Sequence, residues 1–240
     1  MAPPRRTFEA LRTMSETHTT AVEDYLKGIF LLEEAGGPGV TATELAKRLG
    51  VTVSAVSGMI RRLGSAGLVN HRRYGTCTLT ADGRKAAARI LRRRRVIESY
   101  LVEALSYGWE DVDAEAENLE HVVSDRLVER MAKLLGYPAR DPHGDPIPAL
   151  DGTVPRRITW RVSDLEAGAR GVLSRVVDDP PGLLRWLRER GVVLGDAVEI
   201  LGIGANGVCE VRVGGIDNTI ALGNIAASSL ELCVNEKECK

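Results

Sequence analysis

Three residues near the middle of the chain have the types and spacing of cation ligands: Glu117, Glu120 and His121. Positions i, i+3 and i+4 share one face of an α-helix, so two carboxylates and an imidazole would point the same way. Such a donor set is half of a divalent-metal site. A solvated acidic helix face and a general acid–base pair are the alternatives. Because the sequence lacks a second histidine at metalloprotease spacing and a nucleophile motif, we expect a binding protein and not an enzyme.

Charge is segregated along the sequence, although the net charge of the 240 residues is only −1. Between residues 41 and 95 the only acidic residues are Glu44 and Asp82, whereas lysine and arginine are frequent. Acidic residues dominate from residue 96 to residue 151. A basic segment favours a polyanion such as DNA, and an acidic segment favours cations.

No apolar run reaches the roughly 20 residues that a membrane-spanning helix needs. The start of the chain also lacks the apolar core of a signal peptide. We therefore expect a cytoplasmic protein with no membrane partner.

Two short helices are predicted within the basic segment. The first covers residues 40–50 and ends at Gly50, and the second covers residues 51–63 with Thr52 as its N-cap. Two helices joined by a tight glycine turn are typical of a helix-turn-helix, whose second helix reads DNA. The hydroxyl and arginine side chains expected to approach DNA from the second helix are those of Thr52, Ser54, Ser57, Arg61 and Arg62.

A β-hairpin is predicted over residues 67–80, where residues alternate in polarity around Gly75. Arg72 and Arg73 near its tip suit a DNA backbone or minor groove, so the hairpin would be the wing of a winged helix. A helix-turn-helix used only for packing is the alternative. Cys77 in the same hairpin leaves a further alternative, a metal-independent DNA-binding protein that responds to oxidation.

The rest of the chain indicates a mainly α protein with a small β part. We expect a long helix over residues 82–103 and another over 113–135 with one buried apolar stripe. The stripe comprises Leu119, Val122, Val123, Leu127, Met131 and Leu134. A Pro- and Gly-rich stretch over 138–155 predicts a domain boundary, and the short β-type runs after it, interrupted by one helix near 181–190, predict a five-stranded barrel.

Several motifs together resemble a known family. The helix-turn-helix and wing, the run Arg92–Glu98 and the segments Glu115–Asp125 and Asp141–Pro148 look like those of the diphtheria-toxin-repressor / manganese-transport-regulator (iron/manganese-dependent repressor) family, manganese type. The resemblance covers about residues 19–232. It implies a winged helix-turn-helix DNA-binding domain (1–88), a helical dimerisation and metal-binding domain (89–140), a Pro/Gly linker (141–165) and an SH3-like β-barrel domain (166–240).

The resemblance also implies a metal site made by Asp24, Glu117, Glu120 and His121, which joins the DNA-binding domain to the dimerisation domain. Iron-responsive members carry Met and Cys where this chain has Asp24 and Glu117, and hard carboxylate oxygens favour Mn²⁺, with Fe²⁺ or Co²⁺ as substitutes. Thr52, Ser54 and Gly58 match positions that approach bases. The implied function is a homodimeric repressor that binds double-stranded operator DNA when metal is bound. An Fe²⁺-responsive repressor of the same family and a metal-independent winged-helix regulator are the alternatives.

A second, ancillary metal site is where the sequence departs from the family. Glu98 and Asp113 are its candidate ligands, but Arg94 stands where a histidine is expected. A guanidinium cannot ligate a cation. We expect Arg94 to pair with Glu98 or with Asp113 and partly to replace the ancillary ion, which leaves one regulatory metal per subunit. A rearranged two-metal site is the alternative.

Overall fold

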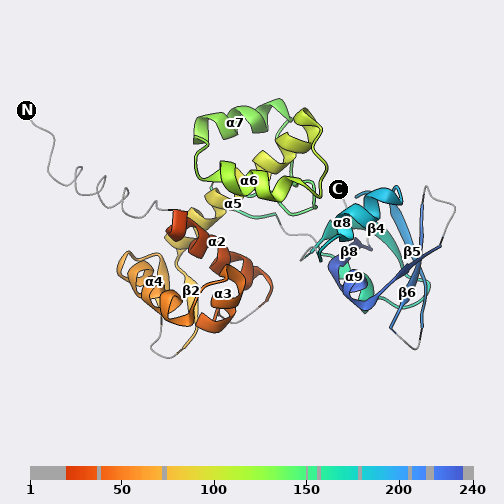
Figure 1. Ribbon diagram of the computed structural model, residues 1–240, viewed down its shortest axis with the longest axis horizontal. Helices are drawn as coiled ribbons and strands as arrows, with labels where there is room; N and C mark the ends of the chain where they lie inside the picture. Colours follow the sequence, from red (N-terminus) through yellow and green to blue (C-terminus); the bar gives the residue numbers. More distant parts are fainter. Residues whose placement is uncertain are drawn as a thin grey trace, which may run out of the picture. The chain divides into compact units, whose positions relative to one another are not determined.

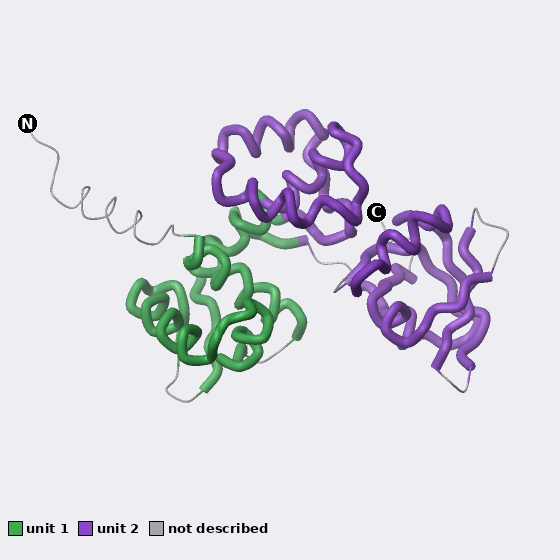
Figure 2. The backbone as a smooth tube through the Cα atoms, viewed as in Figure 1, with its two compact units in different colours: residues 1–93, 148–154 green, residues 94–147, 155–240 purple. Residues whose placement is uncertain are grey.

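The computed structural model describes residues 20–36, 39–71, 75–149, 151–155, 158–177, 180–204, 207–214 and 219–234. Figure 2 shows the two compact units of the chain, one within residues 1–93 and 148–154 and the other within 94–147 and 155–240. The division falls inside the long helix α5 (Ala81–Leu105). None of the helices in the described ranges is both long enough and apolar enough to cross a membrane.

The first unit is the predicted winged helix-turn-helix, which the structure confirms (Figure 1). Helices α2, α3 and α4 are followed by a two-stranded antiparallel hairpin and by the start of α5. In this hairpin Val69 pairs with Leu79, and His71 pairs with Cys77. The elements are α2 (Thr20–Glu34), α3 (Ala42–Leu49), α4 (Val53–Ser65), β1 (Val69–His71) and β2 (Cys77–Leu79).

Local sequence signals explain why α3 and α4 form where they do. Thr41 caps α3 in a capping box with Glu44, and Gly50 ends the helix in the left-handed conformation, with φ of 65°. Thr52 then caps α4, where its side chain accepts a hydrogen bond from the backbone N–H of Ala55. The apolar face of each helix packs into one core with α2, the hairpin and α5; its largest fully buried members include Ile29, Phe30, Leu45, Leu63 and Leu91.

Replacing Thr41 by alanine is expected to lower the stability of the first unit by about 1 kcal/mol, the usual value of an N-cap. The change removes the hydroxyl that accepts from the Glu44 N–H at 3.2 Å and donates to the Glu44 carboxylate at 2.6 Å. Thermal unfolding followed by circular dichroism measures the loss. Thr43→Ala, an exposed threonine inside the same helix, is the matched control; equal melting temperatures for both variants would contradict the capping role.

The second unit contains two short helices where the sequence predicted one over residues 113–135. That prediction was wrong: α6 (Val112–Glu120) and α7 (Asp125–Leu134) are separate. The helix is interrupted because Ser124 takes an extended conformation, and its side chain caps α7 by accepting a hydrogen bond from the N–H of Leu127. The predicted stripe is split accordingly. Leu119, Val123 and Met131 pack against the core, whereas Val122, Leu127 and Leu134 are exposed.

The last part of the second unit is the predicted SH3-like β domain, with one more strand than expected. An antiparallel six-stranded sheet has the order β3-β8-β4-β5-β6-β7 and encloses its own apolar core, with helices α8 (Leu183–Glu189) and α9 (Asn224–Ser229) (Figure 1). The strands are β3 (Trp160–Arg161), β4 (Arg170–Val176), β5 (Ala197–Ile203), β6 (Cys209–Val213), β7 (Thr219–Leu222) and β8 (Leu230–Cys233).

The loop at residues 141–147 attaches this β domain to the helices of the same unit. The carbonyl of His143 accepts from the N–H of Val176 on β4 at 2.9 Å, and Asp145 pairs with Arg175. Gly144 has φ of 89°, and a Cβ there would lie 2.1 Å from the carbonyl oxygen of Ser174. The loop therefore packs directly on β4, and only glycine fits at its closest approach.

Candidate metal centre and nucleic-acid interface

Helix α6 brings Glu117, Glu120 and His121 together. Each offers a ligand atom, and these atoms lie within 4.8 Å of one another. The helix ends at Glu120, but His121 keeps a near-helical backbone, with φ of −88° and ψ of −16°, so the expected shared face is retained. Glu120 is fully buried, and its Oε1 lies 3.4 Å from Nε2 of His121. A buried carboxylate beside an imidazole is a donor set that suits a divalent cation.

Asp24, the fourth predicted ligand, lies on α2 in the first unit. Its carboxylate is half-buried, and Oδ1 lies 3.8 Å from Nζ of Lys27 one helical turn later. The side chain of Glu23 beside it pairs with Arg93 at 3.7 Å. Asp24 thus belongs to the DNA-binding unit, whereas the other three predicted ligands belong to the second unit.

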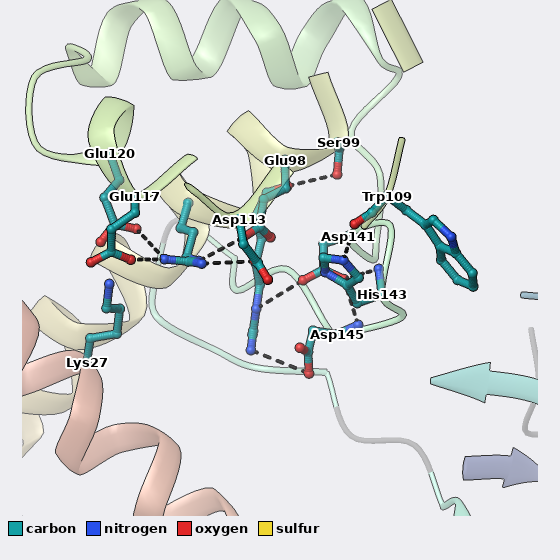
Figure 3. A network of polar contacts seen from close by, with 12 residues as sticks. Lys27, Glu98, Ser99, Trp109, Asp113, Glu117, Glu120, Asp141, His143 and Asp145 are labelled. Carbon is teal, nitrogen blue, oxygen red and sulfur yellow. Dashed lines mark hydrogen bonds and ion pairs between the residues drawn. The ribbon is translucent and has the colours of Figure 1, made fainter. Parts of the chain in front are cut away.

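Arg94 lies among four carboxylates of the second unit. Its Nε is 2.7 Å from Glu98, and one terminal nitrogen is 3.0 Å from Asp113. The expected pairing is therefore confirmed for both partners. The other terminal nitrogen donates to Glu117 and lies 3.7 Å from Glu120, two contacts that the sequence did not predict. Figure 3 shows this row of charged side chains, with Glu117 and Glu120 together at one end.

The charge of Arg94 is secured by these neighbours. Burial by itself disfavours a charged guanidinium, but the carboxylates of Glu98, Glu120, Glu117 and Asp113 outweigh it and hold the pKa of Arg94 above its ordinary value. Arg94 is therefore a permanent internal cation beside the candidate metal ligands.

A second group of ligand types adjoins these side chains: the buried Glu98 and Asp141 and the half-buried His143, whose ligand atoms also lie within 4.8 Å of one another. Several of its polar atoms already have protein partners. Oδ1 of Asp141 accepts from the backbone N–H groups of His143 and Asp145, each at 2.9 Å, and Nε2 of His143 lies 2.7 Å from the carbonyl oxygen of Trp109 and donates to it. Burial, with the carboxylates of Asp145 and Glu98, raises the pKa of Asp141 to about 8. We interpret this group as the polar support of the 141–147 loop.

The candidate nucleic-acid surface is the face of α4 that turns away from the core. Val56, Ile60 and Leu63 are buried on the opposite face. Five of the residues predicted to approach DNA are exposed, and a Cβ added at Gly58 would meet no other atom within 4 Å. The exposed set is Thr52, Ser54, Ser57, Arg61 and Arg62. The wing residues Arg72 and Arg73 lie outside the described residues.

Comparison with known proteins follows the same division of the chain. Residues 17–77 match the family model described as iron dependent repressor, N-terminal DNA binding domain. Residues 80–149 match the metal binding and dimerisation domain of the iron dependent repressor, and residues 161–232 match the FeoA domain. The iron-dependent repressor IdeR of Mycobacterium leprae is 32% identical over 183 residues, which cover 71% of this chain and 79% of that protein. The chain belongs to the diphtheria-toxin-repressor family.

Other members of the family agree with this result. The diphtheria toxin repressor of Corynebacterium diphtheriae is 35% identical over 69% of each chain. A solved structure described as a manganese-dependent transcriptional repressor in complex with manganese is 40% identical, with a TM-score of 0.83 over 89% of this chain and 99% of that one. The chain is therefore a metal-dependent transcriptional repressor of the diphtheria-toxin-repressor family, and not an enzyme.

Cys77 has the wrong surroundings for an oxidation sensor in this repressor. The side chain is buried in the core of the first unit, and burial raises the pKa of its thiol to about 11. At neutral pH the unreactive thiol form therefore dominates. We expect iodoacetamide to leave Cys77 unmodified in the native protein and to alkylate it after denaturation, as read by peptide mass spectrometry. Rapid alkylation in the native state would instead support the oxidation-responsive alternative.

The sequence did not predict the neighbours of the site that come from a loop. Asp141 and His143 approach Glu98 on α5 from more than forty positions away. Gly144 indicates that the Asp-Pro-His-Gly segment forms a turn, but the spacing of its residues does not predict which helix the segment contacts.

Proposed function

We propose that the chain is a cytoplasmic, Mn²⁺-dependent repressor that binds double-stranded operator DNA as a homodimer and controls metal homeostasis. Asp24, Glu117, Glu120 and His121 would hold the metal, so that the ion joins the DNA-binding unit to the second unit. The observation that carries the proposal is that the ligand atoms of Glu117, Glu120 and His121 lie within 4.8 Å of one another, and that the carboxylate of Glu120 is fully buried. The metal would supply further positive charge beside these carboxylates, in addition to that of Arg94.

Manganese is favoured over iron by the donor atoms. All the proposed side-chain ligands are carboxylates except one imidazole, and hard oxygen donors suit Mn²⁺ whereas sulfur donors suit softer metals. One related solved structure is described as a complex with manganese. The Mycobacterium leprae relative is described as an iron-dependent repressor, which makes an Fe²⁺-responsive repressor the second candidate.

A homodimer is supported by apolar residues that the single chain leaves in water. Val122 and Leu134 are 77% and 70% exposed, and Leu105 and Leu127 are also exposed. All four belong to the segment that matches the family's metal binding and dimerisation domain. Large apolar side chains that are exposed in a segment matching a dimerisation domain fit a surface that a second copy of the chain would cover.

The proposed switch follows from the division of the ligands. Without metal, carboxylates from two units repel one another, so the conformation that can bind DNA is a minor population. With metal, the two recognition helices α4 of the dimer would be fixed at a spacing near one helical turn of DNA. Small side chains on α4 leave few direct base contacts, so DNA shape would carry part of the specificity.

The proposal can be tested with a DNA duplex selected from a random library in the presence of Mn²⁺. Binding of the fluorescently labelled duplex is then measured against Mn²⁺, Fe²⁺, Co²⁺ and Zn²⁺, each at matched free concentration with a chelator control. We expect Mn²⁺ to give the largest increase in affinity, with partial effects of Fe²⁺ and Co²⁺. A larger increase with Fe²⁺ would favour the second candidate, and equal binding in chelator would contradict metal dependence.

A further inference from the structure

Arg94 is the residue whose contacts the proposed function leaves unexplained. Its guanidinium reaches Glu98 and Asp113 on one side and Glu117 on the other, and it lies 3.7 Å from Glu120. The side chain is 19% exposed and the carboxylate of Glu120 is fully buried. This arrangement differs from an ordinary surface ion pair, because one guanidinium here lies close to four carboxylates.

The four carboxylates fall into two pairs that Arg94 connects. Glu117 and Glu120 are proposed metal ligands, whereas Glu98 and Asp113 are the candidates for an ancillary site. One divalent cation bound by Glu117 and Glu120 would leave Glu98 and Asp113 negative. Two adjacent carboxylates in a half-buried place attract a further cation unless a fixed positive charge is already there.

We propose that Arg94 is that fixed charge: its guanidinium occupies the position between Glu98, Asp113 and Glu117 that a second divalent cation would take, and so limits each subunit to one metal ion. The inference rests on the proposed function, which supplies the first metal. Arg94 is a positioning residue in this account, because it acts through the carboxylates and does not itself contact the metal as a ligand.

The distances explain why the guanidinium and a second ion exclude each other. A metal bound to Glu98 and Asp113 would need to lie close to the oxygen atoms that Arg94 contacts at 2.7 and 3.0 Å. The guanidinium and a second ion would compete for the same lone pairs of Glu98 and Asp113 and would repel each other at this range. The nearby group of Glu98, Asp141 and His143 offers no ready substitute, because Asp141 and His143 are held by backbone partners.

The full-length protein and three variants test the inference by counting bound Mn²⁺ per subunit, using equilibrium dialysis with electron paramagnetic resonance of the free ion. We expect one Mn²⁺ for the wild type, two for Arg94→Gln and one for Arg94→Lys, which keeps the charge. Arg170→Gln removes a charge of the same sign from the β domain, where Arg170 pairs with Glu199, and should still bind one.

The outcomes separate this inference from the proposed function. Wild-type protein that binds two Mn²⁺ per subunit overturns the role of Arg94, and this result does not depend on whether any variant folds. Wild-type protein that binds one, with a folded Arg94→Gln variant that also binds one, overturns it as well. Wild-type protein that binds no divalent metal overturns the proposed function itself, and the inference with it.

Discussion

Replacing Asp24 by asparagine is expected to remove the Mn²⁺-dependent part of operator binding, a loss on the order of 100-fold in affinity at saturating metal. The substitution keeps the shape of the side chain but removes the charge that the proposed metal site draws from the DNA-binding unit. The remaining ligands on α6 would still bind metal weakly, but the ion would no longer join the two units. Fluorescence anisotropy with the selected duplex, with and without Mn²⁺, measures the effect.

A matched control separates the loss of a ligand from the loss of a negative charge on α2. Glu34 is exposed at the end of the same helix, and Glu34→Gln should leave the metal response unchanged. Both variants should remain dimeric by light scattering, because Asp24 lies outside the segment that matches the dimerisation domain. An Asp24→Asn protein with an undiminished response to Mn²⁺ would exclude Asp24 as a ligand.

Replacing Gly83 by alanine is expected to destabilise the first unit by about 3 kcal/mol, near the upper end of overpacking effects. In an open helix the same change would stabilise by up to about 1 kcal/mol. Here the added Cβ would lie 1.9 Å from the carbonyl oxygen of Leu68, which already accepts from the N–H of Thr80 at 3.0 Å. The start of α5 and the chain leading into β1 would have to separate.

Gly58→Ala is the control for this prediction. Gly58 also lies inside a helix, but a Cβ there meets no other atom within 4 Å. We expect Gly58→Ala to raise the melting temperature and Gly83→Ala to lower it, both followed by circular dichroism without metal. Similar shifts in the two variants would show that α5 does not approach Leu68 as closely as the structure indicates.

The first unit could be predicted from sequence because its signals are local. Thr41 and Gly50 bound one helix, and Thr52 starts the next. Apolar residues at helical spacing then identify the core side of each helix. The same kind of signal was present at Ser124, where a cap follows two valines, but the apolar stripe outweighed it in the prediction of one continuous helix.

The candidate site could likewise be predicted only in its local parts. Its local parts, the face shared by Glu117, Glu120 and His121 and the pair of Arg94 with Glu98, follow from helical spacing. Arg94 contacts Glu117 and Glu120, which lie more than twenty positions later in the sequence. These contacts depend on how α5 packs against α6, which helical spacing does not predict. The order of the sheet also depends on distant pairing, since Leu230–Cys233 (β8) lies between β3 and β4.

In the proposed switch, metal binding and DNA binding by this repressor are linked. The most direct measurement is a titration of wild-type protein and labelled duplex with Mn²⁺, followed by excess EDTA, with anisotropy recorded throughout. We expect DNA binding to rise as Mn²⁺ is added, to saturate with the metal, and to return to its starting value when EDTA removes the ion. Equal affinity for the duplex in Mn²⁺ and in EDTA would contradict it.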